Sequence, residues 1–209
     1  LANYLKITNM KKLLWCPIDL PKFPNRDKLI EYFGNNDNKW YAWNMAKLTT
    51  EVIDDQGINP YAETHLVSEL HDQFPEIIEW IKNLPYKSIR NVKLNKQLKD
   101  VSQHCDFTNP DKDLNLWENN NSTEPSGYRV ILTGKRQNGL YVVSNGERIY
   151  CNMPKETDTY VLTQTVGSHG VLEDTNRWTV YLHLEIDKDE HEKLLEKSLK
   201  KYKEYAIYE

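Results

Sequence analysis

The fold is decided by residues 128–151, YRVILTGKRQNGLYVVSNGERIYC. Residues 128–133 are β-branched and aromatic, and residues 140–143 form a second short apolar run. Gly146, in the sequence Asn-Gly-Glu, precedes the run 148–151, which is the pattern of a hairpin turn between two strands. The stretch therefore predicts three short strands joined by tight connections, with no helix between them.

Further strand-like segments lie on both sides of this stretch. Apolar and polar residues alternate within Ile89–Leu98, and short apolar runs follow at Tyr160–Val166 and Trp178–Ile186. No helical pattern separates these strands, which recur at spacings of roughly ten to twenty residues. Such an order predicts an antiparallel sandwich or barrel rather than a parallel sheet.

Helical patterns flank the β region. Apolar residues recur at helical spacing within Tyr61–Leu84, and Pro75 is expected to divide that pattern into two helices. The charged, periodic segment Asp187–Tyr205 predicts a helix on the domain surface, with partner binding as the alternative. Lys39–Thr50, rich in aromatic residues, predicts a further strand.

The length indicates one domain, or at most two small ones, and the order of the expected elements indicates a single domain of the α+β class, mainly β. A chain of 209 residues with 39% hydrophobic residues can bury one sizeable core. No apolar run approaches the roughly 18 residues of a membrane span. The formal charge of −4 disfavours a nucleic-acid partner, although Lys135 and Arg136 could form a local basic patch. The expected parts are an extended and helical scaffold over 1–85, a β core over 86–187 and a C-terminal helix over 188–209.

The cysteines indicate a reducing compartment. Cys16, Cys105 and Cys151 are odd in number and widely spaced, which fits neither a disulfide framework nor a zinc knuckle. The apolar stretch after Met10, which could be the initiator, is interrupted by Pro17 and is too short for a signal peptide. We therefore expect a cytoplasmic protein.

A long polar segment interrupts the β region. Residues 109–127, NPDKDLNLWENNNSTEPSG, exceed the usual length of a connection and can bury little apolar surface. Such a loop is either a lid over a binding site or disordered. Trp117 within it would cover a substrate or simply anchor the loop.

Two histidines and a carboxylate form a candidate metal site. His104 and Asp106 are two residues apart, so in an extended chain both side chains lie on one face. His169, just past the strand predicted at 160–166, could complete a three-ligand face. Two histidines and one carboxylate are the ligand set of non-haem Fe(II) oxygenases. Taken singly, His104 could be an ordinary strand residue, and the glycines around His169 could mark only a tight turn.

A candidate anion site follows in the sequence. Arg177 and Thr179 are also two residues apart, at the start of the strand predicted over 178–186. A guanidinium beside a hydroxyl suits a carboxylate, because arginine binds carboxylates through two parallel hydrogen bonds. Arg129 is either an exposed cross-strand partner or a second contact to the anion.

The remaining candidates have structural interpretations. His65, His71 and His191 lie in segments predicted to be helical and are expected at the surface. Tyr141 and Tyr150 are expected to be core or cross-strand aromatics. Strand alternation would point Cys105 away from the metal, and His183 is not assigned as a ligand.

The order His104-x-Asp106, His169 and Arg177-x-Thr179 resembles the motif set of the 2-oxoglutarate/Fe(II)-dependent dioxygenases. The segments 89–106 and 128–132 are most similar to the branch of aspartyl/asparaginyl β-hydroxylases and proline hydroxylases. The resemblance covers roughly residues 85–187, about half of the chain. It implies a double-stranded β-helix (jelly-roll, cupin-like) core, with N-terminal helices packed on it and a C-terminal helix.

The resemblance also implies a function. His104, Asp106 and His169 would hold Fe(II), while Arg177, Thr179 and Arg129 would bind the cosubstrate 2-oxoglutarate. No catalytic residue beyond the metal ligands is implied. The substrate would be a free amino acid, or an Asp, Asn or Pro residue in a peptide, hydroxylated with release of succinate and CO2.

Two other interpretations stay open. A cupin-type metal enzyme could use the same ligands without 2-oxoglutarate, and Arg177 would then be dispensable. A non-catalytic β-sandwich, such as a binding or virion-associated module, would bind no metal at all.

Overall fold

The computed structural model describes residues 13–34, 62–65, 73–97, 99–104, 127–162, 168–172 and 176–209. Every segment predicted as a strand from residue 89 onward contains one. Within the described ranges the elements follow in this order: β1 (Leu13–Pro17), α1 (Arg26–Gly34), β2 (Ala62–His65), α3 (Pro75–Lys82), β3 (Tyr86–Gln97), β4 (Val101–His104), β5 (Gly127–Ile131), β6 (Leu140–Ser144), β7 (Glu147–Tyr150), β8 (Thr159–Leu162), β9 (His169–Val171), β10 (Trp178–Ile186), α5 (Lys188–Lys201) and β11 (Ile207–Tyr208).

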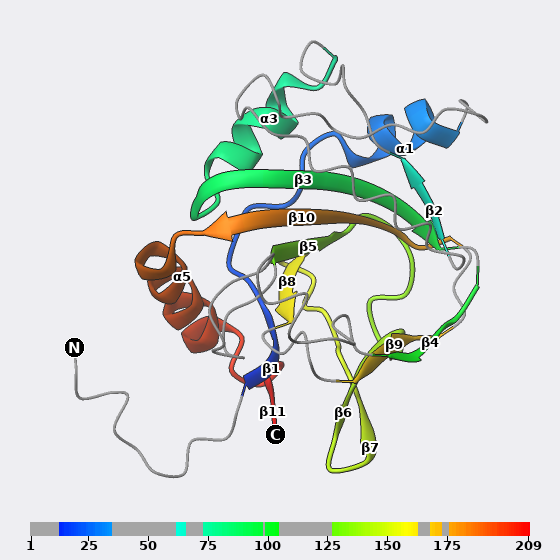
Figure 1. Cartoon of the computed structure of the whole chain (residues 1–209), viewed down its shortest axis with the longest axis vertical. Coiled ribbons are helices and arrows are strands. Elements are labelled where there is room, and N and C mark those ends of the chain that lie inside the picture. The colour runs from blue at the N-terminus through cyan, green and yellow to red at the C-terminus, as the bar shows by residue number, and fades with distance from the viewer. Residues whose placement is uncertain are drawn as a thin grey trace.

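The strands form two antiparallel sheets, so the described part of the chain is mainly β. The large sheet has the order β11-β1-β8-β5-β10-β3-β2, and the small sheet has the order β4-β9-β6-β7. From β3 to β10 the chain crosses repeatedly from one sheet to the other, and only the β6–β7 hairpin stays within one sheet. Figure 1 shows α1 and α3 at one end of the molecule and the β6–β7 hairpin at the other.

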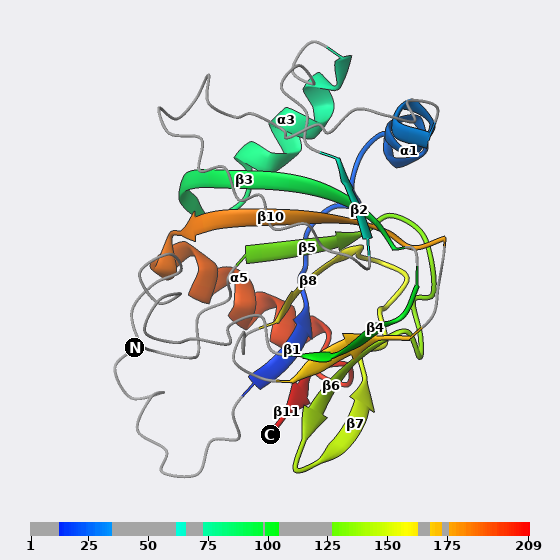
Figure 2. The same ribbon diagram turned by 45° about the vertical axis from the view of Figure 1, so that its right-hand side comes forward.

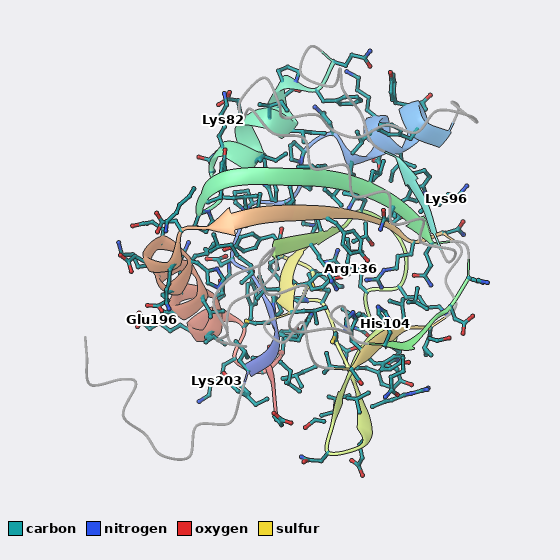
Figure 3. The ribbon with its side chains drawn as sticks, in the orientation of Figure 1. Lys82, Lys96, His104, Arg136, Glu196 and Lys203 are labelled. Atoms are coloured by element: carbon teal, nitrogen blue, oxygen red, sulfur yellow. The ribbon has the colours of Figure 1, made fainter. Side chains whose placement is uncertain are left out.

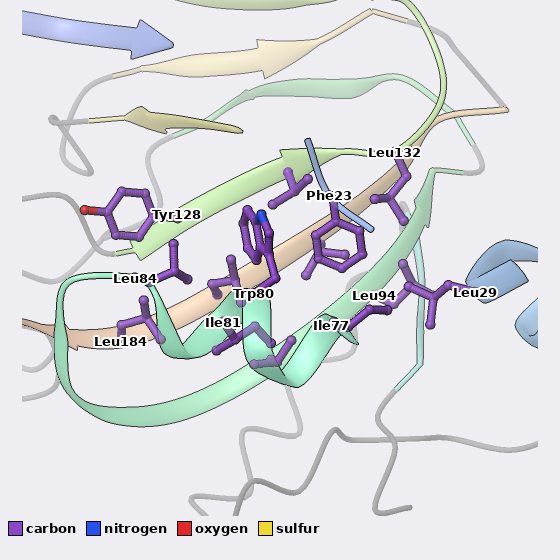
Figure 4. Close-up of a cluster of buried hydrophobic side chains, with 14 of the residues drawn as sticks. Phe23, Leu29, Ile77, Trp80, Ile81, Leu84, Leu94, Tyr128, Leu132 and Leu184 are labelled. Carbon is purple, nitrogen blue, oxygen red and sulfur yellow. The ribbon is translucent and has the colours of Figure 1, made fainter. Parts of the chain in front are cut away.

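The outer face of the large sheet is covered by helices. Alternate residues of β10, such as Val180 and Leu182, point to this face and pack with apolar side chains of α1 and α3. Figure 4 shows Ile77, Trp80 and Ile81 of this cluster. The Trp80 indole nitrogen also donates to the Pro21 carbonyl at 3.0 Å, which ties the β1–α1 connection to α3.

The inner face of the large sheet packs against the small sheet. Trp15, Ile131 and Leu162 from the large sheet share a buried cluster with Leu140 and Val142 from the small sheet. Residues that alternate with these along β5 and β8, such as Val130 and Val161, belong to the outer cluster. This two-sided burial explains why the strands read as nearly continuous apolar runs.

The hairpin predicted at Gly146 is confirmed. Ser144 pairs with Glu147, and the two intervening residues Asn145 and Gly146 have φ values of 51° and 81°. Two successive residues with positive φ define the type I′ turn, which matches the twist of the flanking strands.

The helix predicted over the first half of 61–84 is wrong at its start. Residues 62–65 form β2, which pairs with the end of β3, so His65 lies in a strand. Pairing with a neighbouring sheet edge overrides the weaker helical periodicity. The second helix does follow Pro75, which stands in the first turn of α3. The predicted strand 39–50, His71 and residues 109–126 of the predicted loop lie outside the described residues, and Gly127 begins β5.

The C-terminal helix is present as α5. The carboxylate of Asp187 caps it by accepting from the Glu190 amide at 3.2 Å. His191 was expected at the surface, but it is buried, because its Nδ1 shares a 2.5 Å hydrogen bond with the hydroxyl of Tyr128 on the outer face of the sheet. Figure 2 shows α5 lying beside the sheet. None of the described helices has the length and apolar character that crossing a membrane requires.

Candidate functional site

The two predicted histidine ligands are cross-strand neighbours in the small sheet. His104 ends the edge strand β4 and pairs directly with His169, the first residue of β9. Their ring centroids are 4.5 Å apart, and the rings are inclined by 51°. His169 is buried, whereas His104 lies at the exposed edge of the sheet (Figure 3). Residues 65 positions apart (169 − 104) are thus brought together by strand pairing.

The tautomer of His104 follows from a local hydrogen bond. Its Nδ1 lies 2.8 Å from the backbone carbonyl oxygen of Ser102. A carbonyl oxygen can only accept, so we assign the proton of neutral His104 to Nδ1 and the lone pair to Nε2. Metal-binding histidines in proteins are commonly oriented by such a bond.

The structure brings the two histidines together but does not test the third ligand. Asp106 and Cys105 lie outside the described residues, and no group of three His, Cys, Asp or Glu side chains converges within the described ones. His169 lies within a strand rather than just after one, and the Ser168 carbonyl before it accepts from the Val143 amide at 2.8 Å. The interpretation of this segment as only a tight turn is therefore wrong.

Arg177 and Thr179 form the pair that their spacing predicts. Both are buried, and the Arg177 Nε lies 3.4 Å from the Thr179 hydroxyl oxygen. The Nη1 of Arg177 is buried without a hydrogen-bond partner, and no carboxylate of the described residues pairs with this guanidinium. A buried cation without a counter-charge is costly, since its loss of hydration is uncompensated. An anionic ligand would remove this cost.

Tyr160 is a further polar side chain at this site, and no motif or spacing in the sequence singled it out. Its hydroxyl lies 3.4 Å from Arg177 Nη2, which donates to it. Burial raises the pKa of Tyr160, and the positive charges of Arg177 and Arg129 oppose that rise. The hydroxyl therefore stays protonated at neutral pH, and its proton can be donated to a ligand. Cys151 is close enough for the Arg177 charge to act on it, but burial holds the pKa of the thiol well above its ordinary value.

Arg129 lies on the same face of the large sheet as Tyr160. It pairs with Tyr160 on β8 and with Tyr181 on β10, and its guanidinium stacks over the Tyr181 ring at 4.9 Å. It is half-buried, in contrast to Arg177. The charge of Arg129 thus acts on Tyr160 in addition to that of Arg177.

The predicted basic patch at 135–136 is not an open cationic surface at Arg136. The Arg136 guanidinium forms a 2.7 Å ion pair with the fully buried carboxylate of Asp158. It also donates to the backbone carbonyls of Pro154 and Thr157. Arg136 therefore holds the connection between β7 and β8 in place.

Arg177, which precedes β10 of the large sheet, and the histidine pair of the small sheet both lie near the segment that leads into β6. Arg177 Nη1 is 3.5 Å from the position that a Cβ would take on Gly139. Three residues further along this segment, Val142 pairs with His169. Three residues of extended chain span about 10 Å. The cationic site and the histidines are thus separated by a short distance along one strand.

No protein-family model matches the sequence, and no curated protein matches it either. Among solved structures, the chain is similar to an oxidoreductase of the 2OG-Fe(II) oxygenase family from Burkholderia pseudomallei. The similarity has a TM-score of 0.29 and 16% sequence identity, and it covers 54% of this chain and 54% of the other. The chain thus spans about half the length of that protein. A likeness of this size assigns neither family nor activity, so the site is interpreted from its own residues.

Proposed function

We propose that the chain is an Fe(II)- and 2-oxoglutarate-dependent dioxygenase. The observation that carries this proposal is the buried Arg177 guanidinium, which has an unpartnered Nη1 and lies a short distance from a cross-strand histidine pair. The histidine pair can hold a metal, and the buried cation can bind an anion. Together they could bind the two ends of a dicarboxylate that chelates the metal.

The strand order supports a double-stranded β-helix as the framework. Successive strands from β3 to β10 alternate between two antiparallel sheets, apart from the one hairpin. In this arrangement the end of β4 lies beside the start of β9. We propose this jelly-roll architecture for the β core.

The residues fit the proposed metal. His104 and His169 are adjacent, and the hydrogen bond from His104 Nδ1 leaves Nε2 as the nitrogen that can act as a ligand. Asp106 would complete the set of two histidines and one carboxylate. When bound, iron and 2-oxoglutarate supply the oxidising chemistry, in which substrate, O2 and 2-oxoglutarate give hydroxylated substrate, succinate and CO2.

The inner face supplies the hydrogen bonds for the far carboxylate of 2-oxoglutarate. In this proposal Arg177 and Thr179 bind that carboxylate, and Tyr160 donates its hydroxyl proton to it. Arg129 stabilises the negative charge through its position beside Tyr160. Burial excludes water from this end and so strengthens each of these interactions.

The substrate of this proposed reaction is a free amino acid, or an Asp, Asn or Pro residue of a peptide. This part of the proposal rests on the resemblance of the sequence motifs to the corresponding hydroxylase branch. Succinate release is measured with and without each candidate substrate. An increase on addition of an amino acid or a peptide identifies the substrate class.

The decisive experiment is an anaerobic titration of the full chain with Fe(II) and 2-oxoglutarate. We expect the weak visible charge-transfer band of the iron–2-oxoglutarate chelate. His104→Ala should abolish the band, while Gln103→Ala, a matched change at the exposed neighbour on β4, should retain it. Metal binding without the band would favour a cupin-type enzyme that does not use 2-oxoglutarate. Absence of metal binding in folded protein would favour a non-catalytic module.

A further inference from the structure

The outward face of the small sheet holds a tyrosine that is buried where a strand side chain would ordinarily be exposed. Tyr141 on β6 pairs with Gly170 on β9, one position away from the row that contains His169. Alternation turns Tyr141 away from the inter-sheet core, to which Leu140 and Val142 point. Nevertheless only 2% of Tyr141 is exposed.

Gly170 is the reason that this ring can be buried. A Cβ on Gly170 would lie 2.6 Å from Cζ of Tyr141 and 2.8 Å from the carbonyl oxygen of Val101. Real Cβ atoms essentially never approach other atoms so closely, so any side chain here would displace the ring. The missing side chain thus lets Tyr141 lie over β9, where its hydroxyl oxygen and the Val101 carbonyl oxygen of β4 both border the space that a Cβ would take.

The rest of the ring is enclosed by the hairpin. The Arg148 guanidinium lies 4.6 Å from the ring centroid, and the Tyr150 ring meets it edge-on at 6.4 Å. Aromatic and cationic contacts of this kind are stabilising. Tyr141 therefore joins the β6–β7 hairpin to β9 and extends to the space beside Val101 of β4.

Strand β4, beside which the Tyr141 hydroxyl lies, is more exposed than the neighbouring strand β9. β4 is an edge strand with mostly exposed residues, and its register with β9 is irregular between Val101 and His104. The local bond to Ser102 orients the His104 ring within β4 but does not hold β4 on β9. A side-chain contact that spans both strands would add to the backbone pairing that keeps His104 opposite His169.

We propose that Tyr141 is a positioning residue for the histidine pair. By crossing Gly170 it braces β4 against β9 and so keeps His104 beside His169. This inference rests on the proposed function, because only that proposal makes the two histidines metal ligands. Residues that orient metal ligands typically change metal affinity by 10–100-fold when they are replaced.

The test compares Mn(II) affinity of the full chain, measured by calorimetry without oxygen. Tyr141→Leu, which no longer reaches β4, should weaken binding by about 10–100-fold. Tyr141→Phe, which keeps the ring, should restore most of the affinity. Ile149→Ala, at an exposed position of β7 that pairs with Val142 rather than with Tyr141, should leave it unchanged. Wild-type affinity in Tyr141→Leu would overturn the inference.

A second measurement needs no metal. Hydrogen exchange at the amides of 101–104 should become faster in Tyr141→Leu than in Tyr141→Phe, since β4 loses its brace. If the wild-type chain binds no Mn(II), the proposed function fails, but the exchange rates still test whether Tyr141 holds β4 in place. Equal exchange rates in the two variants would refute that role. Should Tyr141→Leu not fold, Arg148→Ala removes the exposed cover of the ring instead. It should speed exchange in the same segment to a smaller degree, and unchanged exchange would contradict the bracing role.

Discussion

The two faces of the large sheet bury different kinds of side chain. The outer face packs apolar residues of β3, β5 and β10 against α1, α3 and α5, and its polar pair, Tyr128 and His191, is joined by a hydrogen bond. The inner face buries Arg177 and Thr179 beside Tyr160, and the Arg177 Nη1 has no hydrogen-bond partner among the described residues. The outer face therefore supplies stability, whereas the inner face carries an unbalanced charge that a ligand can satisfy.

The largest effect on stability is expected from the outer face. Leu182→Ala removes a fully buried side chain from β10 and should lower the free energy of unfolding by about 3 kcal/mol. Affinity for 2-oxoglutarate should not change in the protein that stays folded. Urea unfolding and calorimetry measure the two quantities. Ile149→Ala, at an exposed position of β7, is the control and should cost less than about 1 kcal/mol.

On the inner face we expect a substitution to lower the affinity for 2-oxoglutarate without lowering stability. Arg177→Met removes the buried charge, so 2-oxoglutarate affinity should fall by about 100-fold, which corresponds to about 2.7 kcal/mol. The free energy of unfolding should stay the same or rise, because an uncompensated cation is replaced by an apolar side chain. The same two measurements apply. A marked loss of stability together with unchanged affinity would make Arg177 a structural residue and erase the contrast between the faces.

A smaller effect tests the polar pair on the outer face. Tyr128→Phe leaves His191 without the hydroxyl and should cost about 1–2 kcal/mol of stability. Denaturant unfolding measures this loss. Tyr208→Phe, at an exposed position of β11, should show none. Any change in cosubstrate affinity in Tyr128→Phe would show that the two faces are coupled.

The smallest effect concerns the attachment of α5. Asp19 forms ion pairs with Lys197 at 2.9 Å and Lys201 at 2.5 Å. Burial alone would raise the pKa of Asp19, but hydrogen bonds and charge from the two lysines lower it overall. Both lysines are largely exposed, so solvent screens the pairs, and Asp19→Asn should cost less than about 1 kcal/mol.

The pH dependence gives this last prediction a sign. A carboxylate with a lowered pKa in the folded chain stabilises it when the group is ionised in both states. The difference between Asp19→Asn and the wild-type chain should therefore be present at neutral pH and disappear as the pH falls below about 4. Thermal unfolding across this range measures it. A difference that persists in acid would assign the effect to packing.

The sequence predicted those features that depend on spacing within one strand. Arg177 and Thr179 touch because residues two apart share a face, and the hairpin at Gly146 follows from its turn residues. Tyr160 was missed because its neighbours are set by the register of β8 with β5, and a single sequence does not reveal register. His191 was misplaced because hydrophobic periodicity takes no account of a histidine that finds a buried partner. His104 and His169 were expected on one shared face. That they are direct cross-strand neighbours depends on β4 lying next to β9, which the sequence does not reveal.

The alternation of strands between the two sheets also has a kinetic consequence. Neighbours in the chain from β3 to β6 do not pair with each other, so most pairings join segments distant in sequence. Domains dominated by such non-local contacts typically fold in milliseconds to seconds, because loop closure precedes any gain from pairing. His104, His169 and Arg177 come together only after both sheets have closed. Until β10 has paired with β3 and β5, those strands present open edges, so a slowly folding chain is exposed to aggregation before its site has formed.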